Sequence, residues 1–310
     1  MSGMDKYSYC SQNDNRMYEI WHGDCSDPGI VKTALEQEKP DILVIAQASS
    51  HNDRSMEDPG LFFRDNALAT QVLLEEARRQ GIKRVFIIST DEVIKHIPPQ
   101  KGNYFMFDGP LGFDQVTHRS RTFYRAREIA DIEWTFFNPT SPYSASKASM
   151  EFIVNAYRKA FQMDNITIIR PTNVFGPRQF PEKLISQSIV KALKGEPIPI
   201  YSEGEEWRDF TYVDDTCRAL DLIFSQESPE PLYHISANDE RQNINTVREI
   251  LRQTGQSEDL IEFVQHNRGK SHDFSYSLSS ARIRDLGWAP KVSFEEGISR
   301  TIQYYKNLTK

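Results

Sequence analysis

The chain has 310 residues and a formal net charge of −7, which is long enough for one large α/β unit with a smaller lobe. The acidic balance argues against a nucleic-acid partner, and no apolar run approaches the roughly 18 residues that a membrane-spanning helix needs. The three cysteines fit no CxxC pattern and the histidines no zinc-binding spacing, so we expect reduced thiols and no metal site. Residues 1–15 are polar, unlike a signal peptide, so we expect a cytoplasmic protein.

Apolar runs alternate with helical patterns over the first two thirds of the chain, which is typical of a parallel sheet with helical crossovers. The predicted strands are residues 18–21, 42–46, 85–88 and 166–169, and the predicted helices are residues 28–38, 59–80 and 142–161. Asp27 and Ser141 precede prolines as helix N-caps, and Gly81 is a C-terminal stop. The fold class is therefore α/β, with an open parallel sheet.

Proline and glycine recur after Arg170, and the elements become shorter. We expect a smaller α/β lobe to begin there. The predicted division is a first domain of residues 1–170 with 210–236 returning to it, and a lobe of residues 171–209 and 237–310. Within the first domain, residues 102–132 carry a basic cluster, which we interpret as a solvated helix in preference to a phosphate site. Its members are Arg119, Arg121, Arg125 and Arg127.

Thr90, Asp91 and Glu92 directly follow the apolar run 85–88. Open α/β sheets bind ligands beyond the carboxyl ends of their strands, and both acids can reach one ligand if the backbone turns near Ser89. Two carboxylates in one cleft can hold different protonation states, one acting as an acid and the other as a base. An isolated Asp–Glu pair is more often a helix cap or the start of a polar loop.

Tyr143 and Lys147 are four residues apart near the start of a predicted helix, so both project from one face. A nearby ammonium favours the phenolate, and we expect it to lower the Tyr143 pKa and make this side chain a usable base. The YxxxK spacing alone often occurs by chance on a helix surface. Its place in the segment 141–149, after the strand that ends at the acid pair, favours a functional reading.

Taken together, these motifs resemble the extended short-chain dehydrogenases/reductases of the NAD-dependent epimerase/dehydratase family. Within that family they are most similar to the nucleotide-sugar 4,6-dehydratases, the group that includes the dTDP-glucose 4,6-dehydratases. The resemblance implies a Rossmann-like, doubly wound sheet. The acid pair separates the dehydratases from the epimerases and reductases. The matching segments are residues 51–55, 89–93, 141–149, 173–177, 180–184, 208–213 and 286–288.

The resemblance implies a role for each residue of the two motifs. Tyr143 would take the proton from the hydroxyl at carbon 4 of the sugar while NAD accepts the hydride, and Thr90 would bond the same hydroxyl. Lys147 would hold the nicotinamide ribose. Glu92 would remove the proton from carbon 5, and Asp91 would protonate the hydroxyl that leaves carbon 6. The product would be a 4-keto-6-deoxy sugar nucleotide, formed without a metal.

The same resemblance assigns binding residues and an assembly. The substrate, a dTDP- or UDP-hexose, would contact Asn173, Lys183 and Arg208, with Arg208 at the diphosphate. The cofactor would also contact Asp5, Asp24 and Ala46, with Asp24 near the adenine and Asp5 at its ribose. A homodimer is implied, with the helices 59–80 and 142–161 as its interface.

The printed sequence departs from the family pattern at three places. No GxxGxxG turn precedes Asp5, so we expect weak cofactor binding and a gap between the strands 18–21 and 42–46. Ile94 stands where the family has tyrosine, and Ser275 where it has an arginine. Two readings stay open besides an active dehydratase: an impaired paralogue that acts as a nucleotide-sugar binder or partner subunit, and an epimerase or reductase of the same superfamily.

Overall fold

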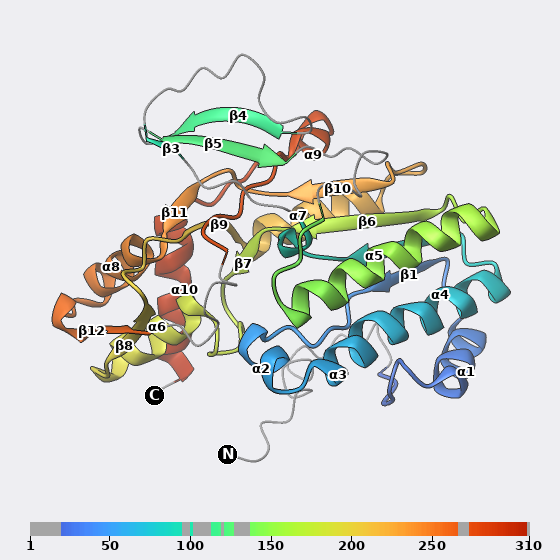
Figure 1. Ribbon diagram of the computed structural model, residues 1–310, viewed down its shortest axis with the longest axis horizontal. Helices are drawn as coiled ribbons and strands as arrows, with labels where there is room; N and C mark the ends of the chain where they lie inside the picture. Colours follow the sequence, from blue (N-terminus) through green and yellow to red (C-terminus); the bar gives the residue numbers. More distant parts are fainter. Residues whose placement is uncertain are drawn as a thin grey trace.

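The structure, a computed structural model, describes residues 20–94, 137–265 and 273–308, and the backbone of three strands between residues 100 and 126. Its main sheet is parallel, with the strand order β1-β2-β6-β10 (Figure 1). The strands are β1 (Ile42–Ile45), β2 (Arg84–Ile88), β6 (Ile166–Pro171) and β10 (Leu232–Ile235). The predicted parallel α/β sheet is therefore confirmed. Thr90, Asp91 and Glu92 lie just beyond the carboxyl end of β2.

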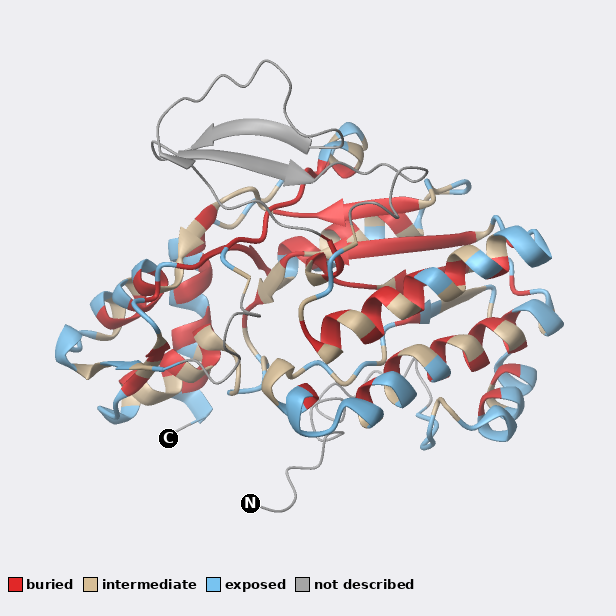
Figure 2. Cartoon of the chain, in the orientation of Figure 1, coloured by how far each residue is buried: buried red, intermediate tan, exposed pale blue. Residues whose placement is uncertain are grey.

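The β2 strand is buried on both faces of this sheet, as its unbroken apolar run predicts. Val85 and Ile87 join a core formed with α1 (Pro28–Glu38), α4 (Ala69–Gln80) and α5 (Pro142–Phe161). Phe86 points the other way and joins a core with α7 (Val213–Phe224) and α9 (Ala281–Asp285). Figure 2 shows the buried strands between helices whose outer faces are exposed.

The helix termini confirm the capping predictions. The Asp27 side chain accepts from the Gly29 amide at 2.8 Å, Ser141 and Ser144 form a reciprocal capping box, and Gly81 adopts the left-handed conformation that ends α4. The predicted helix 59–80 is helical throughout, but it begins as α3 (Pro59–Phe62) and continues through a π-helical segment (Phe63–Leu68) before α4.

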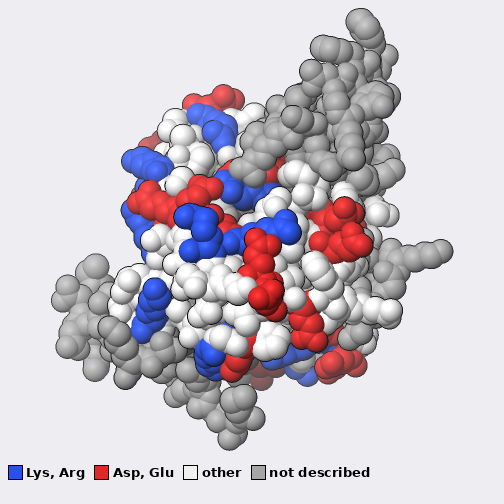
Figure 3. All heavy atoms as spheres, turned by 90° about the vertical axis from the view of Figure 1, so that its left-hand side faces the viewer, with Lys and Arg blue, Asp and Glu red and all other residues white. Residues whose placement is uncertain are grey.

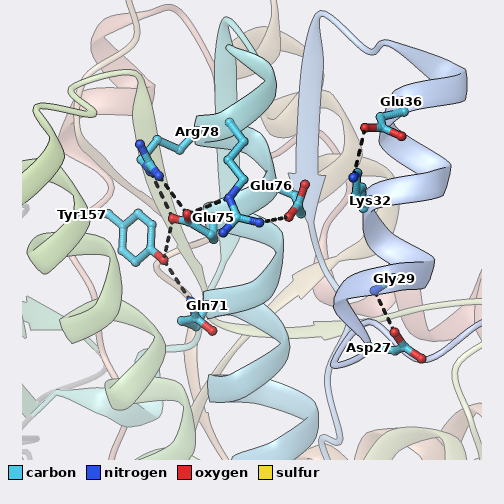
Figure 4. Close-up of polar contacts among 10 residues, drawn as sticks. Asp27, Gly29, Lys32, Glu36, Gln71, Glu75, Glu76, Arg78 and Tyr157 are labelled. Atoms are coloured by element: carbon cyan, nitrogen blue, oxygen red, sulfur yellow. Dashed lines mark hydrogen bonds and ion pairs between the residues drawn. The ribbon is translucent and has the colours of Figure 1, made fainter.

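Polar side chains join α4 to α5, two of the helices that cover the core containing Val85 and Ile87. The Tyr157 hydroxyl donates to Glu75 at 3.4 Å and accepts from the Gln71 amide at 3.0 Å (Figure 4). Arg78 binds both Glu75 oxygens, at 2.8 and 3.0 Å. These contacts fix the two helices side by side, and α5 carries the residues of the YxxxK motif.

A second lobe is built from segments on both sides of β10, the strand with which the chain returns to the main sheet. It contains a three-stranded sheet of β7 (Asn173–Phe175), β9 (Trp207–Tyr212) and β11 (Glu240–Gln242), and a parallel pair of β8 (Ile198–Tyr201) and β12 (Ile261–Val264). Its helices are α6 (Leu184–Lys194), α8 (Asn243–Thr254) and α10 (Phe294–Leu308). Figure 3, which shows the side of the molecule that carries this lobe, places basic side chains among acidic ones.

Two sequence-based predictions of secondary structure are wrong. Ile20 and Trp21 lie outside any strand, and residues 18 and 19 lie outside the described part of the chain. The Trp21 indole instead donates to Glu38 of α1 at 2.8 Å. Residues Arg121–Ala126, interpreted as part of a helix, form β5, which pairs with β4 (Phe113–His118) and β3 (Gln100–Lys101). No helix among the described residues is long and apolar enough to cross a membrane.

Candidate active site

The chain turns sharply where β2 ends, and this turn directs the acid pair into a cavity. Thr90 caps a 3-10 helix (Asp91–Val93), with its hydroxyl oxygen accepting from the Glu92 amide at 3.3 Å. The same hydroxyl donates to Asp91 Oδ1 at 3.1 Å. Because the backbone leaves the strand here, adjacent side chains no longer alternate between the faces of the sheet. The turn expected near Ser89 is therefore confirmed.

A cavity of about 610 Å³ lies between the end of the main sheet and the second lobe. Its volume suits a ligand of the size of a drug or a cofactor fragment. The structure brings seven of the predicted site residues to its wall: Thr90, Asp91, Glu92, Tyr143, Asn173, Lys183 and Arg208.

The two acids differ in their surroundings. Asp91 is 2 % exposed, and its burial, with the charge of Glu92, raises its pKa to about 8, although a hydrogen bond from Thr90 opposes the shift. Its carboxyl is therefore protonated at neutral pH. Glu92 is half-buried, and its Oε2 accepts from Asn52 Nδ2 at 2.7 Å. The arrangement offers a proton donor and a proton acceptor on one turn.

Tyr143 lies in the first turn of α5, opposite the acid pair. Burial, followed by the charge of Glu92, raises its pKa, and a hydrogen bond with Thr90 opposes the shift. The ring meets Phe62 edge to face, with 6.3 Å between centroids. The prediction that Lys147 lowers the Tyr143 pKa is wrong in this structure, because desolvation and the carboxylates dominate.

Lys147 lies one helical turn beyond Tyr143, behind the cavity wall. It is 3 % exposed, and its Nζ donates to the carbonyl of Ile88 at 2.9 Å. Burial lowers its pKa to about 8, although Glu151 opposes the shift. The ammonium is thus tied to the last residue of β2, close to the turn that carries the acid pair.

A buried ion pair supports this corner and was not recognised from the sequence. Arg170, the next-to-last residue of β6, binds Glu151 of α5 through both carboxylate oxygens, and each side chain is 2 % exposed. The Ser89 hydroxyl also donates to Glu151. The sequence signals were a glutamate one turn after Lys147 and an arginine that ends an apolar strand.

The second lobe supplies the other wall of the cavity. Arg208 on β9 is 8 % exposed; it donates to the carbonyls of Trp207 and Asp273 at 2.7 and 3.0 Å, and its guanidinium lies 4.2 Å from the Tyr276 ring centroid. Lys183, before α6, donates to the carbonyl of Ser50 at 2.7 Å.

Asn173, the first residue of β7, also faces the cavity. Its Oδ1 is buried and meets no hydrogen-bond partner among the described residues. A buried amide oxygen without a donor is costly unless a ligand or water satisfies it, so this atom suits contact with a polar ligand.

Asp24 and Ala46, which the resemblance assigns to the cofactor, do not line this cavity. Asp24 is exposed, and its Oδ1 accepts from the amide and hydroxyl of Ser26, both at 2.8 Å, which lower its pKa. Ala46 is exposed and directly follows the carboxyl end of β1. Asp5 lies outside the described residues. These assignments stay predictions.

Comparisons with known proteins agree with this geometry. The model of the NAD dependent epimerase/dehydratase family matches residues 2–236. A dTDP-glucose 4,6-dehydratase of Escherichia coli is 34 % identical over 98 % of this chain and 86 % of its own length. The crystal structure of DesIV, a dTDP-glucose 4,6-dehydratase from Streptomyces venezuelae with NAD and TYD bound, has a TM-score of 0.77 and 32 % identity, covering 92 % of this chain and 79 % of its own.

A more distant structure shares the fold. UDP-glucose 4-epimerase from Thermotoga maritima, solved with UDP-glucose, has a TM-score of 0.79 at 23 % identity and covers 96 % of this chain and 87 % of its own. The main sheet of the present chain is therefore of the Rossmann type seen in these enzymes. With the family match over most of the chain and a relative of 34 % identity, the chain belongs to the NAD dependent epimerase/dehydratase family.

Proposed function

We propose that this protein is a nucleotide-sugar 4,6-dehydratase, which converts dTDP- or UDP-glucose into the 4-keto-6-deoxy sugar nucleotide and water. One observation carries the proposal: Asp91, whose pKa is raised to about 8, and the adjacent Glu92 line the same cavity as Tyr143. An epimerase needs to move hydrogen only at carbon 4, whereas a dehydratase also needs an acid and a base at carbons 6 and 5. The relatives named dTDP-glucose 4,6-dehydratase support the proposal.

NAD is the proposed cofactor, and its nicotinamide end would lie near the carboxyl ends of β1 and β2. Tyr143 and Lys147, on one face of α5, carry donors that would bond the ribose. Ala46 leaves the carboxyl end of β1 without a bulky side chain. When bound, NAD supplies a hydride acceptor for carbon 4 and a hydride donor for carbon 6. The chain's own residues hold the sugar and move the protons.

The proton transfers follow from the positions of the side chains. Tyr143 would accept the proton of the hydroxyl at carbon 4 as a phenolate, a form that its raised pKa disfavours in this structure and that the positive charge of a bound nicotinamide would favour, with Thr90 bonding the same oxygen. The resulting ketone makes the proton at carbon 5 acidic, and Glu92 removes it. Asp91 gives its proton to the hydroxyl at carbon 6, which leaves as water. Glu92 returns a proton to carbon 5 after carbon 6 has received the hydride, so the sugar loses one molecule of water overall.

Residues of the second lobe are proposed to hold the nucleotide. Arg208 offers a guanidinium fixed by two carbonyls and by Tyr276, which suits a diphosphate. Asn173 and Lys183 also line the cavity and would contact the sugar. In this proposal the reacting hexose lies between the two lobes.

We also propose a homodimer in which α5 and the segment before α4 form the interface. Phe152 and Phe161 of α5 are 44 % and 49 % exposed, and Phe63 and Leu68 of the adjoining π-helical segment are 41 % and 47 % exposed. Large apolar side chains gathered on packed neighbouring helices favour burial against a partner.

The experiment is to incubate the protein with dTDP-glucose or UDP-glucose and NAD⁺ and to follow the 4-keto product by its absorbance in alkali. Turnover with either substrate, abolished by Glu92→Gln, would support the proposal. Formation of a carbon 4 epimer that keeps its carbon 6 hydroxyl would instead favour an epimerase. Binding of the sugar nucleotide by calorimetry without any product would favour a binding protein.

A further inference from the structure

The short helix α2 (Asn52–Glu57) follows β1 in the chain (Figure 1). Its first residue, Asn52, donates from Nδ2 to Glu92 Oε2 at 2.7 Å, although the two residues are 40 positions apart in the chain. Asn52 also lines the cavity. The family resemblance assigned it no role.

Contacts from both lobes hold Asn52 in place. The Ser55 hydroxyl donates to the Asn52 carbonyl at 2.6 Å, and the carbonyl of Ser50, two residues earlier, accepts from Lys183 at 2.7 Å. On the next residue, Asp53 accepts from the Tyr201 hydroxyl at 3.5 Å. The backbone on either side of Asn52 is therefore fixed to α2 itself and to the second lobe.

The orientation of the Asn52 amide matches an ionised partner. A carboxylate only accepts hydrogen bonds, so it requires the N–H side of an amide. The Asn52 Oδ1 is buried and has no hydrogen-bond partner among the described residues, so a reversed amide would place this oxygen against the oxygen of Glu92. The donated bond therefore sets the orientation of the amide against the Glu92 carboxyl.

Glu92 shares the wall of the cavity with Asp91, Tyr143, Tyr276 and Arg208. After burial, its charge is the next cause that raises the pKa of Asp91, Tyr143 and Tyr276, and the Arg208 charge lowers the pKa of Asp91 and Tyr276. The orientation of the Glu92 carboxylate therefore bears on its neighbours in the cavity. The side-chain amide of Asn52 is a neutral donor, so it can orient this carboxylate without giving it a proton.

We propose that Asn52 is a positioning residue for proton abstraction at carbon 5: its amide orients the Glu92 carboxylate and stabilises the ionised form that accepts the proton. The inference rests on the proposed function, since it assigns Glu92 the role of base. Asn52 acts on the site through Glu92, because it makes no hydrogen bond to Tyr143 or Thr90 among the described residues.

The kinetic test uses substrates deuterated at carbon 4 or at carbon 5. Asn52→Leu removes the donor at similar volume, and we expect kcat to fall about tenfold or more, as for a hydrogen bond to a charged group. The deuterium isotope effect on kcat should rise for the substrate labelled at carbon 5 and fall for the one labelled at carbon 4. The reason is that proton abstraction from carbon 5 becomes the rate-limiting step. Asn52→Asp, nearly isosteric, should be slower still, because it places a second carboxylate against Glu92.

Glu57→Gln is the matched control. It changes an exposed side chain on the same short helix and leaves Asn52 and its contacts in place, so both isotope effects should stay as in the unmodified protein. The proposal is overturned if Asn52→Leu leaves the carbon 5 isotope effect unchanged, or if Glu57→Gln changes it equally.

A second readout does not depend on turnover. The side-chain amide signals of Asn52 in a ¹H–¹⁵N spectrum, assigned by their loss in Asn52→Leu, should shift when Glu92 is changed to Gln. If the protein makes no product from either sugar nucleotide, the proposed function fails. The spectrum still shows whether the Asn52 amide contacts the Glu92 carboxylate. Signals that do not respond to Glu92→Gln would overturn the inference.

Discussion

The hydroxyl of Thr90 donates to the carboxyl of Asp91 at 3.1 Å while its oxygen accepts from the amide of Glu92 at 3.3 Å. One threonine therefore sets the directions of both acids. The chain turns at this residue, so two neighbours in the sequence line one cavity, and burial raises the pKa of Asp91 to about 8. The proposed chemistry needs one of the two as an acid and the other as a base.

The pH dependence of turnover should report Asp91. Its pKa is raised to about 8, and the proposed role needs the protonated form, so kcat should fall as the pH rises through about 8. Asp91→Asn cannot give up a proton and should reduce kcat by about 100-fold or more. Steady-state rates between pH 6 and 10 measure this, and a rate that keeps rising to pH 10 would speak against Asp91 as the acid.

The same residue should make the fold less stable at high pH. Unfolding returns the Asp91 pKa from about 8 to its usual value of 3.8, so between these values the folded state binds the proton and stability falls as the pH rises. Relative to the unmodified protein, Asp91→Asn should become more stable as the pH rises from 4 to 9. Urea unfolding at several pH values measures the difference, and equal pH dependence in both proteins would contradict the assignment.

Breaking the buried Glu151–Arg170 pair should destabilise the corner behind the site. Glu151→Leu leaves the Arg170 guanidinium buried without its carboxylate, and the expected loss is about 3–5 kcal/mol of unfolding free energy. The control is Glu258→Gln, which breaks a pair with Arg248 whose side chains are 61 % and 50 % exposed and should cost less than about 1 kcal/mol. Similar losses in the two variants by chemical denaturation would contradict this account.

Arg208→Met should weaken substrate binding more than it slows the chemistry. We expect KM to rise about tenfold or more, the size of a lost hydrogen bond to a charged group, with a smaller change in kcat. Arg248→Met, an exposed arginine on α8, serves as the control and should leave both constants unchanged. If kcat falls and KM does not, Arg208 acts on the reacting sugar instead of the diphosphate.

The proposed dimer can be tested on its exposed aromatic side chains. Replacing Phe152 and Phe161 with Lys should convert a dimer into a monomer in light scattering, because two charges would be buried without partners. Phe263→Lys on β12, which is 57 % exposed, should not change the mass. A monomeric unmodified protein would remove the proposal.

The features that could be predicted from the sequence are those set by local spacing. The apolar run before Thr90, the four-residue step from Tyr143 to Lys147 and the caps at Asp27 and Ser141 each depend on neighbours within one element. For this reason the strand end, the helix face and the helix bounds were predicted correctly, and the motif order identified the family.

The features that were missed depend on contacts between distant segments. A segment forms a strand only when another strand lies beside it. Trp21 has no such neighbour among the described residues, and its indole instead donates a hydrogen bond to Glu38. The contact of Asn52 with Glu92 spans 40 positions, and the direction of the Tyr143 pKa follows from burial among carboxylates that the YxxxK spacing does not reveal. Basic residues in 121–126 suggested a solvated helix, but pairing with β4 makes this segment a strand.

The most direct test of the central claim follows one hydrogen atom. The protein is incubated with NAD⁺ and dTDP-glucose or UDP-glucose carrying deuterium at carbon 4, and the product is examined by NMR. The account predicts a 4-keto-6-deoxy product with the deuterium at carbon 6, and no such product from Glu92→Gln. A product that keeps its hydroxyl at carbon 6, or no product from either substrate, would contradict it.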